Sequence, residues 1–197
     1  MKPPTLQFWI VLLMFVMACA LAGCAGDRQV VLTPPVLTPG QGLLARQPAR
    51  QVTLLPVKDA RQGNRMLGQT TAAFGVKMGD NFSSTDVPAL IYDTVANEFR
   101  AAGHSVGTSG VPVQITIHEF QVRTDTTPIY WDIIATAKID LQIGPTTRHY
   151  ESRATTREWV NPGAEQMSTL LKTCLSDIGG QIRNDSALVA AFTATPA

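Results

Sequence analysis

Polar and apolar residues alternate most regularly between Trp131 and Ile143. The apolar positions fall on every second residue: Trp131, Ile133, Ala135, Ala137, Ile139, Leu141 and Ile143. The positions between them are polar, with Ile134 as the one exception. A period of two predicts a strand with one packed face and one wet face, which is typical of antiparallel sheets. Residues 144–147 predict a turn, and residues 150–157 continue as the hairpin partner of this strand.

Two other stretches carry apolar residues at helical spacing, and both predict amphipathic helices. These residues are Val87, Leu90, Ile91, Val95, Phe99 and Ala102 in the first stretch, and Ala164, Met167, Leu170, Leu171, Cys174, Leu175, Ile178 and Ile182 in the second. Asp86 is the expected N-cap of the first helix, and Gly103 its expected end. Asn161 is the expected N-cap of the second helix, because a proline for the first turn follows it. Residues 184–186 can cap a last short helical turn.

Three further segments predict strands. Residues 51–58 are apolar on both sides, which is typical of a central, covered strand. Residues 111–117 alternate, but the phase slips after His118 and Glu119, and a β-bulge would account for that slip. Bulges can re-aim side chains near a site, yet they are common in ordinary sheets, and we favour the ordinary bend. Residues 73–78 predict a short strand.

This order of elements predicts an α+β fold. We expect a two-layer sandwich, with a mainly antiparallel sheet of four to five strands and the two amphipathic helices on one face. Residues 51–197 would form this single domain. Residues 24–50 are rich in proline and glycine, which predicts an extended linker. Within that linker, residues 30–32 are apolar enough to dock on the domain or to extend a sheet edge.

An apolar run from Phe8 to Ala22 precedes the linker and ends in Leu21-Ala22-Gly23-Cys24. This ending resembles the lipobox of bacterial lipoprotein precursors, which are cleaved before the cysteine. Residues 1–23 are therefore expected to be a signal peptide. An uncleaved membrane anchor is the alternative, since a spanning helix needs about 20 apolar residues. The small residues beside the cysteine favour the lipobox.

The lipobox resemblance implies a location as well as a modification. Cys24 would carry a thioether-linked diacylglycerol and, usually, an acylated amino terminus, and two or more chains hold a protein stably on a membrane. Ala25 follows it, where an aspartate commonly retains lipoproteins at the inner membrane. The resemblance thus implies a lipid-anchored protein on the outer membrane that faces the periplasm.

Charge and cysteine content exclude several classes of function. Cleavage before Cys24 would remove one basic residue, Lys2, and leave equal numbers of basic and acidic residues. A nucleic-acid partner is not expected, because it normally requires a basic face. Of the three cysteines, Cys19 would be discarded and Cys24 lipidated. The remaining cysteine, Cys174, lies on an apolar helical stripe and predicts a core residue, not a nucleophile.

No catalytic, metal-binding or cofactor-binding constellation is apparent in the sequence. The three histidines, His104, His118 and His149, lack the spacing of a metal site. No phosphate-binding loop or serine nucleophile elbow occurs. Asp59 and Arg61 are two residues apart on an extended chain and can pair, for which we expect a surface salt bridge worth about 0–1 kcal/mol.

One group of exposed residues predicts an interaction. Alternation along the last strand places Arg153, Arg157 and Trp159 on its outer face, while Tyr150 belongs to the core set. Trp and Arg often dominate interface energies, so these three residues are the candidate interaction site. The alternative is a merely solvated, charged strand.

The succession of elements resembles a known family. Its marks are the lipobox, the spacer with Leu32-Thr33-Pro34-Pro35, the strand ending in Asp59-x-Arg61, the helix closing at Ala102-Gly103-His104, and the run Ile134-Ala135-Thr136-Ala137. Together they resemble the YajG family of uncharacterised bacterial lipoproteins, which offers no established catalytic residues to carry over.

Two functional hypotheses lead from these patterns. The first is a non-enzymatic binding or accessory subunit of a cell-envelope assembly, with an envelope protein as partner. The second is a carrier lipoprotein for lipid or glycan, which would need an apolar pocket between helices and sheet. An enzyme is the third and least supported hypothesis.

Overall fold

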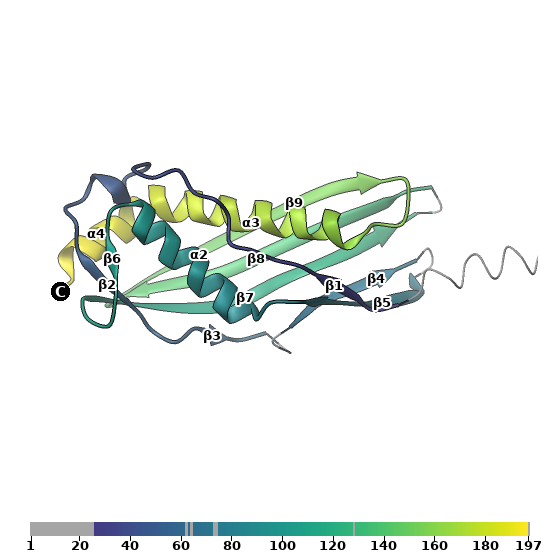
Figure 1. The fold of residues 1–197 in the computed structure, drawn as a ribbon, viewed down its shortest axis with the longest axis horizontal. Coiled ribbons are helices and arrows are strands. Elements are labelled where there is room, and N and C mark those ends of the chain that lie inside the picture. The colour runs from purple at the N-terminus through teal and green to yellow at the C-terminus, as the bar shows by residue number, and fades with distance from the viewer. Residues whose placement is uncertain (1–25, 62, 64, 73–74, 128, 197) are drawn as a thin grey trace, which may run out of the picture.

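The computed structural model describes residues 26–196, apart from 62, 64, 73–74 and 128. The predicted signal peptide and Cys24 lie outside this range. Within it, no helix combines the length and apolarity needed to cross a membrane. The domain is elongated, with the long strands running along its axis and the C-terminus at the end opposite to the start of the described chain (Figure 1).

Three long antiparallel strands form the body of the fold. They are β7 (Val111–Thr126), β8 (Trp131–Ile143) and β9 (Thr146–Glu158). The β8–β9 turn sets Ile143 opposite Thr146 and Trp131 opposite Glu158. Alternate residues of β8, such as Ile139, are buried, as the period of two predicts. The register of β7 on β8 shifts between Ile117 and Glu119, which confirms the predicted bulge.

Shorter strands extend this sheet on the β7 side. They are β2 (Gln51–Leu54), β3 (Lys58–Asp59) and β6 (Ser105–Val106). The six-stranded sheet has the order β6-β2-β7-β8-β9, with β3 also paired to β7. The single strand predicted over 51–58 is thus two short strands, both parallel to β7. The α+β sandwich is confirmed, but the sheet is mixed and has more strands than predicted.

Helices cover one face of the six-stranded sheet (Figure 1). They are α2 (Val87–Ala101), α3 (Ala164–Asn184) and α4 (Ser186–Ala194). Asp86 caps α2 by accepting a hydrogen bond from the Ala89 amide, and Gly103 ends it with φ at 90°, both as predicted. The cap predicted at Asn161 is wrong. Gly163 is the N-cap residue of α3, and its amide donates to Gln166 Oε1 at 3.0 Å.

A second, three-stranded sheet lies beside the distal half of β7. It has the order β1-β5-β4, with β1 (Arg28–Val30), β4 (Met66–Thr71) and β5 (Lys77–Ser83). The Thr71 amide donates to Thr124 Oγ1 at 2.9 Å, which joins β4 to β7. The strand predicted over 73–78 is misplaced: β5 begins at Lys77, and residues 73–74 lie outside the described part. Sequence pattern missed β4 because its buried positions include the polar Thr70.

Residues 28–50, predicted to be an extended linker, instead pack along the domain. Strand β1 pairs in parallel with β5, which realises the predicted addition to a sheet edge. Leu32 and Leu44 are buried, the latter in the short 3-10 helix η1 (Leu44–Arg46). The Gly40 amide donates to the Ala101 carbonyl at 2.8 Å. The described part of this segment is therefore a strap on the domain and adds little reach to a tether.

Candidate functional site

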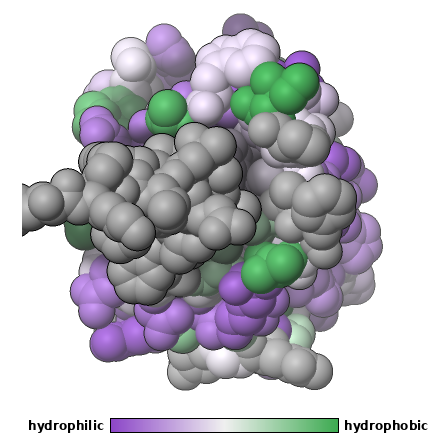
Figure 2. All heavy atoms as spheres, turned by 90° about the vertical axis from the view of Figure 1, so that its right-hand side faces the viewer, coloured by the Kyte–Doolittle hydropathy of each residue, from purple (hydrophilic) through white to green (hydrophobic). Residues whose placement is uncertain are grey.

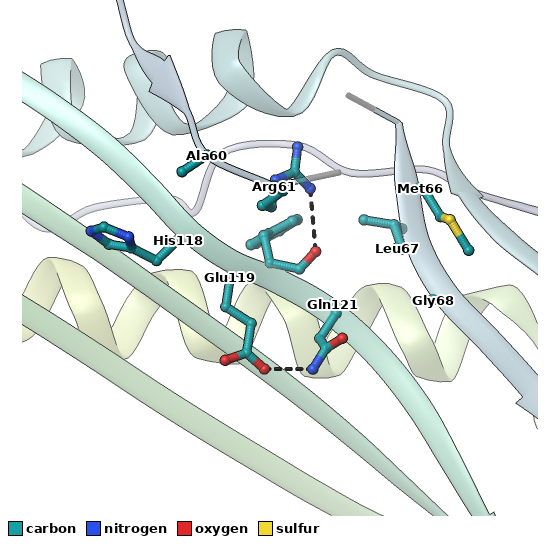
Figure 3. Close-up of a pocket in the computed structure, with 9 residues that line it drawn as sticks. Ala60, Arg61, Met66, Leu67, Gly68, His118, Glu119 and Gln121 are labelled. Atoms are coloured by element: carbon teal, nitrogen blue, oxygen red, sulfur yellow. Dashed lines mark hydrogen bonds between the residues drawn. The ribbon is translucent and has the colours of Figure 1, made fainter. Parts of the chain in front are cut away.

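The bulge of β7 lines a surface pocket of about 350 Å³. Its walls come from the end of β3, from β4 and from β7 (Figure 3): Ala60, Arg61, Met66, Leu67, Gly68, His118, Glu119, Phe120 and Gln121. Close approach of β4 to β7 shapes its floor, because a Cβ added at Gly68 would lie 2.4 Å from the Val122 carbonyl oxygen. Only glycine fits there, and its φ of +127° disfavours other residues as well.

The guanidinium of Arg61, which lines this pocket, is neutralised by Asp59 of the same protein. Arg61 donates from Nε to Asp59 Oδ1 at 2.9 Å and from Nη2 to Asp59 Oδ2 at 2.7 Å. Its Nη1 donates to the Phe120 carbonyl at 3.3 Å (Figure 3). Burial alone would raise the pKa of Asp59, but the hydrogen bonds and charge of Arg61 bring it below its usual value. The predicted pairing is confirmed. Its predicted surface position is wrong, since the two side chains are only 7% and 10% exposed.

Two histidines flank one carboxylate on the wet face of the sheet. His118 Nε2 lies 2.8 Å from Asp140 Oδ2, and His149 Nδ1 lies 2.6 Å from Asp140 Oδ1. Burial pushes the pKa of Asp140 up, but the hydrogen bonds from the two rings bring it below its usual value. Among residues 26–196, outside the stated gaps, no group of His, Cys, Asp and Glu side chains is arranged to hold a metal ion.

The candidate interaction residues fall into two places. Arg157 forms a bidentate ion pair with Asp132, at 2.8 and 3.0 Å, and its Cζ lies 3.7 Å from the centroid of the Tyr130 ring. That ring meets Trp159 edge-on at 6.0 Å, and Trp159 is 69% exposed. Arg153 lies opposite Thr136, four residues earlier on β9 and therefore about 13 Å away.

Sequence reasoning missed the partners of Arg157. The pairing of Asp132 with Arg157 follows from the turn, because a register that sets Ile143 opposite Thr146 also sets these two residues opposite each other. The predicted turn at 144–147 could have identified Asp132 as a partner of Arg157. A two-residue connection fixes the register of the whole hairpin.

A buried ion pair between α2 and α3 was also missed. Glu98 is fully buried and accepts a hydrogen bond from Arg183 Nη1. Burial raises the pKa of Glu98 above its usual value, and the hydrogen bond and charge of Arg183 oppose this shift. Glu98 Oε1 has no hydrogen-bond partner among the described residues. Helical spacing could have predicted the burial of Glu98, because Glu98 follows Val95 by three residues on the apolar stripe of the predicted helix.

Side chains fill the space between the helices and the six-stranded sheet. Phe99, Leu171 and Phe192 are fully buried there. Cys174 is also buried, with its Sγ 3.6 Å from the Ala135 carbonyl oxygen, and burial raises the pKa of its thiol. It is a core residue, as predicted. A carrier would need a hollow at this interface, so this packing disfavours the carrier hypothesis.

Comparison with known proteins places the chain in a family. A family described as "Uncharacterized lipoprotein" matches residues 50–193. The crystal structure of protein XCC0632 from Xanthomonas campestris is similar to the chain in fold, with a TM-score of 0.53, 10% identity, and coverage of 83% of this chain and 95% of that one. A minor lipoprotein from Acinetobacter baumannii has a TM-score of 0.41, 11% identity, and coverage of 68% and 88%. Comparison with curated proteins finds no match. The chain belongs to this family of uncharacterised lipoproteins, in agreement with the resemblance to the YajG family.

Proposed function

We propose that this protein is anchored by lipid on Cys24 to the outer membrane, faces the periplasm, and serves there as a non-enzymatic accessory subunit of an envelope assembly. The filled interface between helices and sheet carries the proposal. Because Phe99, Leu171 and Phe192 fill this interface, the described residues leave the outer surfaces for binding. The lipoprotein family and the lipobox support the anchor.

The wet face of β7, β8 and β9 is the surface we assign to the protein partner. Its charges are arranged as pairs and bridges. Lys138, for example, lies 3.1 Å from Glu119 and 3.2 Å from Glu151. A face that pairs charges of both signs can present a complementary charge pattern to one partner, which favours specific contacts over nonspecific adhesion. Arg153 is exposed on the same face, opposite Thr136 of β8.

Site-specific crosslinking in intact cells tests the partner. A photoreactive amino acid at Arg153 of the full-length protein should yield one defined adduct. The same group at Thr173, which is exposed on α3, should not yield that adduct. Identical adducts from both positions, or none from either, would refute the assignment of this face.

Fatty-acid labelling tests the anchor separately. The wild-type protein should incorporate labelled fatty acid, and Cys24→Ala should abolish incorporation and leave the precursor uncleaved. Incorporation that persists in Cys24→Ala would overturn the assignment of Cys24 as the lipidated residue.

A further inference from the structure

Three loops and the start of the described chain meet at one end of the domain. The β7–β8 loop lies there because Thr126 is opposite Trp131, and the β9–α3 loop lies beside it because Trp131 is opposite Glu158. The β4–β5 loop joins them, since the Thr71 amide binds Thr124. All three loops lie at the right-hand end in Figure 1.

Exposed apolar side chains concentrate on these loops. Seven large hydrophobic residues are exposed in the described part of the chain, and four of them belong to this end: Val76, Ile129, Trp159 and Val160. Between 60% and 70% of each side chain is open to solvent. Figure 2, which views this end directly, shows separate hydrophobic patches on this face of the molecule. We call these four residues the apolar tip.

Hydrogen bonds fix the start of the described chain at the apolar tip. The Gly26 amide donates to the Met78 carbonyl at 2.8 Å. Arg28 donates to Thr70 Oγ1 at 3.1 Å and to Asn161 Oδ1, in the β9–α3 loop, at 3.0 Å. Gly26 lies two positions after Cys24, and two residue steps span at most about 7 Å. A lipid on Cys24 therefore holds this end of the domain, and no other, close to the bilayer.

We propose that the apolar tip inserts into the interface of the bilayer that holds the lipid anchor, so that the domain stands end-on with its long strands pointing away from the membrane. The inference rests on the proposed lipidation of Cys24. Exposed apolar loops that must stay within a few ångströms of a bilayer lower their free energy by entering it. Trp159 and Tyr130 have the amphipathic rings that favour the headgroup level.

Basic residues near the apolar tip are paired with acidic residues of the protein. Arg157 binds Asp132, Lys77 binds Asp80 at 2.7 Å, and Arg123 lies 3.8 Å from Asp125. Among the residues described at this end, no block of unpaired basic side chains is present to attract anionic headgroups, so the contact is apolar and aromatic in character. Insertion should therefore occur in zwitterionic bilayers and depend little on salt.

Tryptophan quenching by brominated lipid tests this arrangement. The mature chain has two tryptophans, since Trp9 leaves with the signal peptide. In Trp131→Phe, Trp159 is the only reporter. The acylated, full mature protein is reconstituted in phosphatidylcholine vesicles with bromine near the top of the acyl chains. Trp159 fluorescence should fall roughly twofold, because interfacial insertion buries side chains about 5–10 Å deep.

A matched control places the reporter at the other end. Thr147 is exposed at the β8–β9 turn, and the length of β8 separates it from the apolar tip by about 40 Å. The variant Trp131→Phe/Trp159→Phe/Thr147→Trp should show no quenching on the same vesicles. With both native tryptophans kept, Ile129→Asp/Val160→Asp should weaken quenching and leave the melting temperature unchanged, since both side chains are exposed.

The outcomes separate this inference from the proposed function. Acylated protein that floats with the vesicles but shows no Trp159 quenching would overturn the end-on contact and leave the anchor intact. That result would make the apolar tip a protein-binding surface. Quenching that requires anionic lipid, or that is equal at Thr147, would also overturn the inference. Protein that carries no fatty acid and does not float would overturn both proposals.

Discussion

Gly179→Ala is expected to destabilise the domain although it replaces a glycine inside a helix. A Cβ at this position of α3 would lie 1.8 Å from Glu98 Oε1 and 2.7 Å from Glu98 Cδ. The carboxylate must therefore move. Because Glu98 is fully buried, it cannot move into solvent without losing Arg183 or opening the contact between α2 and α3.

The magnitude follows from two opposed effects. Alanine in a helix is favoured over glycine by about 1 kcal/mol. Separating a buried carboxylate from its cation costs about 3–5 kcal/mol. The net destabilisation is then about 2–4 kcal/mol, or a fall in melting temperature of about 5–15 °C for a chain of this size.

Gly180→Ala is the matched control on the same helix. A Cβ there meets only Arg183 NH2, at 3.8 Å, so the helix propensity of alanine should dominate and the melting temperature should rise slightly. Thermal melts followed by helical circular dichroism measure both variants. In a double-mutant cycle, Glu98→Ala should remove most of the cost of Gly179→Ala. If Gly179→Ala melted at or above the parent temperature, the packing argument for Glu98 would be refuted.

Two more predictions concern the end of the domain near the C-terminus. His104 Nδ1 accepts from the Arg50 amide and Nε2 donates to the Leu44 carbonyl, both at 3.2 Å, and burial lowers the pKa of His104. The contribution of neutral His104 to stability is present above about pH 6.5 and is lost as pH falls through its lower native pKa. The melting temperatures at pH 7.5 and pH 5.5 should therefore differ less in His104→Gln than in the parent. Arg50 donates to the Phe192, Thr193 and Thr195 carbonyls at the end of α4. Arg50→Met should therefore destabilise the domain by about 1–3 kcal/mol and speed amide hydrogen exchange in α4. Unchanged exchange in α4 would refute this capping role of Arg50.

The elements that sequence predicted best are those whose burial is apolar and periodic. The β8–β9 hairpin, α2 and the β7 bulge all follow from such patterns, because an alternating or helical stripe has one way to face the core. Strand β4 escaped prediction, and β5 was misplaced, for the opposite reason. Their buried positions include Thr70 and Asn81, which satisfy each other by hydrogen bonds at 3.1–3.2 Å and leave no apolar signal.

The candidate site could be predicted only in part. Exposure of Arg157 and Trp159 followed from strand alternation. Their assembly with Tyr130 depended on the β7–β8 loop, whose conformation no local pattern defines. Of the packing of residues 28–50 on the domain, only docking of residues 30–32 was predicted, since proline-rich chain predicts an extended conformation wherever it runs. Its docking depends on long-range partners, such as Ser168, whose hydroxyl donates to the Val31 carbonyl at 2.6 Å.

Strand β1 also determines how a force on the anchor would enter the domain. It runs parallel to β5, with Arg28 opposite Asn81 and Val30 opposite Ser83. A pull on the lipid acts on Gly26 along the strand, so the hydrogen bonds of β1 would be loaded together in shear and would not open one by one. If shear did free the strap, residues 28–43 would release about 50 Å of chain. The same segment would then be part of the folded domain at rest and an extended tether under tension.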